Sequence, residues 1–151
     1  MTTVHDAIVD HALQLLRLPA PVCDGPIEEE LDLDDLGESI ADAVSIDLPA
    51  SEADDSRFAQ GSVMDWTSNL TIQCAARDDS RNAGASAGRA SRNLHALVHA
   101  RLMADPSFGD RLEYFAIRSL RTEGRDLNHR LGRCTAVYEL KHRSAQTTLE
   151  A

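Results

Sequence analysis

Two histidines have the spacing of a possible metal site. His95 and His99 lie four residues apart, which lets two imidazoles on one helix hold one ion. Ala96 follows His95, so the glutamate of an HExxH motif is absent, and no third ligand is evident. We therefore expect both histidines to be solvated side chains on a helix.

Two other segments approach known binding patterns without matching them. Residues 32–37 begin like a calcium loop, but Leu36 occupies the fifth position and Ala43 the twelfth, where oxygen ligands are required. Residues 84–88 contain two glycines but lack the Gly-Lys-Ser/Thr ending of a phosphate-binding loop. We expect an acidic loop and a connector, with no bound metal.

Nucleophilic and acid–base arrangements are also missing from the sequence. Cys23, Cys74 and Cys134 form no CxxC pair, and no serine lies in a nucleophile elbow. The carboxylates of residues 28–38 are too many and too exposed in character to nominate a general acid and base. We predict an intracellular protein without disulfides that is not an enzyme and needs no cofactor.

The charge is unevenly distributed along 151 residues, a length that suits one domain, 1–151. Residues 1–60 hold fifteen acids and two arginines, a net charge of −13, whereas residues 61–151 hold ten acids and thirteen bases, a net charge of +3. The total of −10 disfavours specific nucleic-acid binding. Such an asymmetry is expected for ordinary solvated surface, and the alternative is a head-to-tail contact between subunits. Fourteen of the fifteen bases are arginine, which favours fixed, bidentate pairing over loose charge.

The elements that would position these residues are a long strand and a long helix. Apolar residues alternate through residues 66–77, which predicts a strand with one buried face. A stripe of residues spaced three and four apart predicts a helix from residues 83–87 to about Ala104, where Asp105 and Pro106 end it.

Further elements follow from the same periodicities. We predict a helix over residues 4–18, a long acidic loop over about 19–42, and strands over 43–48, 63–77, 112–122 and 132–142, with a flexible tail over about 144–151. Within the strand 112–122, Phe115 and Ile117 are expected on one face and Leu120 on the other. The order predicts an α+β fold: a mostly antiparallel four-stranded sheet with two helices on one face.

This succession of elements resembles the siphophage tail terminator family (the minor tail protein U type) and related tail-completion proteins. The resemblance rests on a helix stopped at residues 104–110, a strand ending at residues 120–123, and a closing alternating strand over residues 132–143. Residues 44–48 and 67–76 match the earlier strand pair, so the resemblance spans almost the whole chain. The acidic residues 27–38 depart from the family pattern.

The resemblance implies a virion protein, assembled in the host cytoplasm, that forms a hexameric ring at the head-proximal end of a phage tail. Its partners would be copies of itself, the tail tube protein and a head-completion or neck protein. The ring would stop tube polymerisation, and DNA would pass through its lumen without specific binding. No membrane contact is implied.

We hypothesise that the subunits of such a ring contact each other through acids of one copy and arginines of the next. The candidates are Glu28, Glu29, Glu30, Asp32, Asp34 and Asp35 on one side, and Arg118, Arg121, Arg125, Arg130 and Arg133 on the other. Candidate tube-contacting residues lie in two polar loops: Asp54, Asp55, Arg57, Asp78, Asp79 and Arg81.

Three other classes of protein remain open at this point. A neck protein of the head–tail connector would also form a ring. A bacterial adaptor or dimeric regulator would form a small oligomer without tube binding. An acidic binder of a small ligand or metal would gain stability when that ligand is added.

Overall fold

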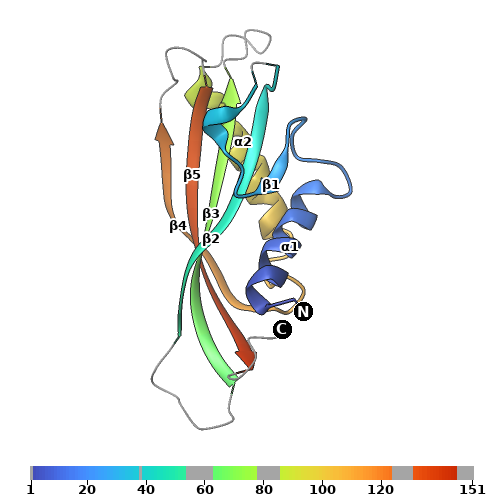
Figure 1. Cartoon of the computed structure of the whole chain (residues 1–151), viewed down its shortest axis with the longest axis vertical. Coiled ribbons are helices and arrows are strands. Elements are labelled where there is room, and N and C mark those ends of the chain that lie inside the picture. The colour runs from blue at the N-terminus through green and yellow to red at the C-terminus, as the bar shows by residue number, and fades with distance from the viewer. Residues whose placement is uncertain (1, 38, 54–62, 78–85, 124–130, 146–151) are drawn as a thin grey trace.

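A computed structural model describes residues 2–37, 39–53, 63–77, 86–123 and 131–145 (Figure 1). The elements are, in chain order, α1 (Val4–Arg17), β1 (Ile27–Glu29), the 3-10 helix η1 (Leu33–Asp35), β2 (Asp42–Ala53), β3 (Val63–Arg77), α2 (Ala87–Met103), β4 (Leu112–Glu123) and β5 (Leu131–Ala145). The predicted helices and the four long strands are confirmed. The strand at residues 43–48 extends to Ala53.

The sheet has five strands in the order β1-β2-β3-β5-β4. The pairs β2–β3, β3–β5 and β5–β4 are antiparallel, but β1 pairs in parallel with β2, so the prediction of four strands is wrong. The predicted loop over residues 19–42 contains β1 and η1. Three consecutive glutamates after Ile27 give no alternation, which hid this short strand from the pattern analysis.

Both helices lie on one face of the twisted sheet, as Figure 1 shows. The α1 helix begins at Thr3, whose side chain and backbone exchange hydrogen bonds with Asp6 in a capping box. Its buried side is built from the row Val4, Ile8 and Ala12 and the adjacent Val9, Leu13 and Leu16. Because Pro19 and Pro21 follow, the chain leaves the helix there.

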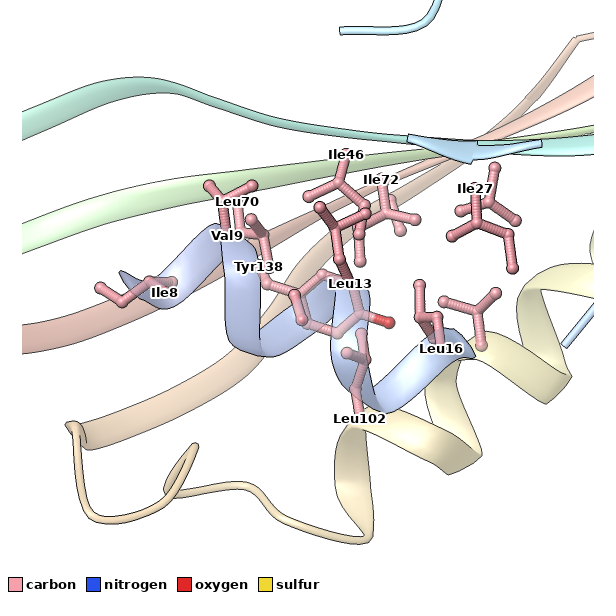
Figure 2. Close-up of a cluster of buried hydrophobic side chains, with 14 of the residues drawn as sticks. Ile8, Val9, Leu13, Leu16, Ile27, Ile46, Leu70, Ile72, Leu102 and Tyr138 are labelled. Atoms are coloured by element: carbon pink, nitrogen blue, oxygen red, sulfur yellow. The ribbon is translucent and has the colours of Figure 1, made fainter. Parts of the chain in front are cut away.

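The main core lies between the helices and the sheet (Figure 2). Its largest fully buried side chain is Tyr138 of β5, which stacks on Phe115 of β4 with ring centroids 4.9 Å apart. Cys74 and Cys134 are register partners on β3 and β5 and are fully buried free thiols, which pack there as small hydrophobic residues.

A second, smaller cluster covers the opposite face of the sheet. Leu33 of η1 is only 3% exposed and packs with Ala43, Ala75 and Leu131. These three residues alternate with the side chains that face the helices, so they lie on the other side of the sheet. The acidic segment therefore crosses one edge of the sheet and is anchored on its far face.

Candidate functional site

The first edge of the sheet is strongly acidic. β1 forms this edge, and Glu28, Glu29 and Glu30 are all exposed there. Partial burial, and then the neighbouring carboxylates of Glu30 and Asp6, raise the pKa of Glu29 above its usual value. The negative charges of this edge are therefore close enough to repel each other.

The acidic segment after β1 is held by the chain's own residues. The Asp32 side chain accepts a hydrogen bond from the Asp34 amide and caps η1. Asp34 forms an ion pair with Arg133 of β5. Thus two residues assigned to opposite sides of a subunit contact meet within one chain, on the far face of the sheet.

The opposite edge, β4, carries arginines and exposed apolar groups. Arg118 donates to Glu139 at 2.8 Å, and this partner raises the pKa of the arginine. Arg121 is more accessible, with its side chain 79% exposed and Glu123 at 3.8 Å. The cationic groups of Arg118 and Lys141 lie 5.8 and 5.4 Å from the centre of the Tyr114 ring.

A bulge changes the orientation of side chains along β4. Ile117 is the register partner of Tyr138, and Leu120 is the partner of Ala136, with the register shifting between Ile117 and Ser119. Both residues therefore lie on the helix side of the sheet, and the prediction that Leu120 faces the other way is wrong. Arg118 occupies the extra position of the bulge.

The remaining predicted interface and loop residues fall outside the described parts of the chain. These are Arg125 and Arg130 of the interface set, and Asp54, Asp55, Arg57, Asp78, Asp79 and Arg81 of the tube-contacting set.

The two helix histidines are not solvated as predicted. His95 is 6% exposed and its Nε2 lies 3.0 Å from the Tyr138 hydroxyl, while His99 Nδ1 lies 2.8 Å from the same oxygen. Burial, and then proximity to His99, lower the pKa of His95. A buried tyrosine hydroxyl needs hydrogen-bond partners, and the position of Tyr138 inside the core draws both imidazoles to it.

Arg101 finds a different partner from the one expected. From its position within the apolar arc of the helix, the sequence predicts either an extended, water-facing guanidinium or a carboxylate partner. In the structure it donates to the carbonyl oxygens of Leu15 and Leu18, at 3.3 and 3.1 Å. It therefore joins α2 to the C-terminal end of α1, where the helix dipole favours a cation.

Sequence reasoning missed a second histidine cluster, near the start of α1. His142 Nε2 lies 2.6 Å from Ser68 Oγ, which lies 2.6 Å from Ser51 Oγ. The rings of His5 and His142 meet edge to face at 5.2 Å. Burial, and then His5, lower the pKa of His142 to about 4. The alternation of Leu140 and His142 on one strand was the available signal, because it places the histidine on the buried face.

Neither cluster has the composition of a metal centre. Within the described ranges, no group of three or more His, Cys, Asp or Glu side chains could hold a metal ion. In the same ranges, no helix is long and apolar enough to cross a membrane. The features that distinguish the described surface are therefore the two unlike edges of the sheet.

The fold defines a class: a five-stranded mixed sheet with two helices on one face and two oppositely equipped edges. Solved structures with a similar overall fold include two that align over nearly the whole of this chain. A chain from the virion of a native gene transfer agent particle aligns with a TM-score of 0.54 and 16% identity, covering 93% of this chain and 98% of that one.

The second structure is the sheath/tube terminator of an extracellular contractile injection system in its extended state, which aligns with a TM-score of 0.53 and 13% identity. It matches over 100% of this chain, which spans 61% of the length of that one. No family model and no curated protein matches the sequence. At these identities the likeness establishes the fold.

Proposed function

We propose that this protein is a structural, non-enzymatic component of a phage tail or tail-like particle, and that it acts as a tail terminator. The observation that carries the proposal is the fold shared, over 93% and 100% of this chain, with a virion component and with a sheath/tube terminator. The sequence resemblance to tail terminators, which rests on the order of elements, supports the same function independently.

In this proposal the protein forms a ring, hexameric as in the siphophage family, that caps the tail tube and stops its polymerisation. It joins the tail to the head-completion proteins and lies at the head-proximal end of the particle. An overall charge of −10 suits a ring around a DNA channel, because acidic walls repel phosphates and prevent sticking.

The two edges of the sheet support a head-to-tail contact between subunits. Glu28, Glu29 and Glu30 lie at the β1 edge, whereas Arg118 and Arg121 lie on β4 at the other edge. Surfaces that differ on opposite sides of a subunit produce heterologous contacts, which close into rings when the rotation permits. Of the three described arginines in the interface set, Arg121 has the most exposed side chain, 79%, and its partner in its own chain, Glu123, lies 3.8 Å away.

The tube-contacting role proposed for residues 54, 55, 57, 78, 79 and 81 follows from their polar sequence.

The test combines light scattering with a tube-capping assay. We expect a mass near six subunits, either alone or after addition of tube protein from the same particle. Substoichiometric amounts should shorten growing tubes, since one ring stops each end. Unchanged tube length and a fixed dimer at every concentration would instead favour the adaptor class.

A further inference from the structure

β4 carries most of the large hydrophobic side chains that are exposed among the described residues. There are five such side chains, and three of them lie on this strand: Tyr114 (38%), Ile117 (39%) and Leu120 (50%). β4 also lies at the edge of the sheet, with no strand beyond it in the described part of the chain. A long edge strand with apolar side chains is a surface that associates unless it is covered.

The other two exposed hydrophobic residues lie toward the opposite side of the molecule. Leu18 (58%) follows α1, and Leu97 (57%) lies on α2 one turn before Arg101. Arg101 bonds to the carbonyl oxygen of Leu18, so Leu97 lies on the α1 side of α2.

This second apolar patch adjoins the acidic edge. The Arg17 guanidinium donates to the Ile27 carbonyl oxygen at 3.0 Å from Nε, which ties the end of α1 to β1. Leu18 therefore lies next to the exposed glutamates that follow Ile27.

The charges of the two edges complement each other as the apolar groups do. Arg121 projects from β4 with its side chain 79% exposed, while Glu28, Glu29 and Glu30 are exposed at β1.

The directions of the two edge strands also suit such a contact. Because β1 is parallel to β2 and each later neighbour in the sheet is antiparallel, β4 runs antiparallel to β1. A second copy in the same orientation would present its β1 antiparallel to β4.

We propose that β4 of one copy docks on the α1–β1 edge of the next copy. Ile117 and Leu120 contact the Leu18 and Leu97 patch, and Arg121 faces residues 28–30 of the neighbour. The inference rests on the proposed function in one respect, because it names the surfaces through which the ring closes. The occupant of both edges is a second copy of this chain.

The first test replaces an apolar contact by a charge. Leu120→Arg places a guanidinium in the apolar part of the contact, and we expect the dissociation constant of self-association to rise at least tenfold in sedimentation velocity. Asn69→Arg is the matched control, because Asn69 is exposed on the far face of the central strand β3, away from both patches, and it should assemble like wild type. Far-ultraviolet circular dichroism verifies the fold of each variant.

The second test exchanges charges across the contact. Arg121→Glu and Glu28→Arg should each weaken association several-fold, because each places like charges together. Combining both in one chain restores opposite charges at every contact of a head-to-tail ring, so the double variant should regain much of the affinity. Both side chains are exposed, so neither change disturbs the core.

The outcomes separate this inference from the proposed function. A wild-type oligomer that is unaffected by Leu120→Arg and Arg121→Glu overturns the assignment of the edges and leaves the ring intact. A wild-type protein that stays monomeric at every concentration, with and without tube protein, overturns both. Loss of assembly in the single variants with recovery in the double variant supports the inference.

Discussion

His142 illustrates how a single buried side chain couples stability to pH. Its Nδ1 has no hydrogen-bond partner among the described residues, and its Nε2 contacts Ser68. Burial disfavours the imidazolium, and His5 adds repulsion, so the pKa falls from 6.5 to about 4. The unfolded chain then binds the proton more tightly than the folded chain does.

The protein should therefore lose stability as the pH falls below neutrality. The contribution of neutral His142 to the free energy of unfolding is complete above pH 6.5, and it is lost as the pH falls toward about 4. The lowered pKa values of His5 and His95 act in the same direction. We expect the urea midpoint to fall between pH 7 and pH 5, and to fall less in His142→Gln, which does not titrate. Equal pH slopes in the two proteins would contradict this assignment.

Tyr138 joins a helix to the sheet through its hydroxyl group. Tyr138→Phe keeps the ring and its stacking on Phe115 but removes the oxygen that contacts His95 and His99. Since an unsatisfied buried polar group costs about 1–3 kcal/mol, we expect a loss of that order in the free energy of unfolding. Chemical denaturation measures it, and an unchanged midpoint would show that water replaces the hydroxyl.

At the scale of the elements, one glycine sets how closely α2 approaches β5. A Cβ at Gly132 would lie 2.3 Å from the carbonyl carbon and oxygen of Ala87 and 2.8 Å from the nitrogen of Gly88. Gly132→Ala should therefore push the start of α2 outward and destabilise the protein by about 1–3 kcal/mol. Gly37→Ala is the control, because its nearest neighbour would be Ser39 Oγ at 3.9 Å. Equal thermal midpoints for the two variants would refute the close contact.

The elements also show what the sequence could predict. Alternation and helical spacing located both helices and all four long strands, because each carries a local pattern of apolar residues in its own sequence. β1 has only three residues, and its parallel pairing with β2 depends on tertiary contacts that leave no local pattern. The bulge at Arg118 reversed the expected face of Leu120 for the same reason. The charge asymmetry was visible, but only the strand order places the acidic β1 and the arginines of β4 at opposite edges.

Leu33 determines whether the acidic segment stays on the sheet. It is 3% exposed and forms the centre of the small cluster on the far face. Leu33→Ala should lower the free energy of local unfolding of this segment by about 2–3 kcal/mol, which is within the range for truncation of a buried leucine. We expect faster amide exchange across residues 31–36, whereas exchange in α2 should be unchanged. Uniformly faster exchange would mean that this segment unfolds only with the whole domain.

At the scale of the whole molecule, an acidic first part and a mildly basic remainder would make assembly depend on salt. An exposed ion pair contributes about 0.2–1 kcal/mol, so a pair between Arg121 and residues 28–30 of the neighbour amounts to at most roughly a fivefold change in affinity. The screening length falls from about 10 Å at 0.1 M salt to about 3 Å at 1 M, which removes most of this attraction. We therefore expect self-association to weaken by roughly that factor over the range, as measured by sedimentation, and Arg121→Glu to flatten the dependence. If salt strengthened assembly instead, the contact would be carried by Ile117, Leu120 and their apolar partners, with the charges of the two edges serving only to orient the approach.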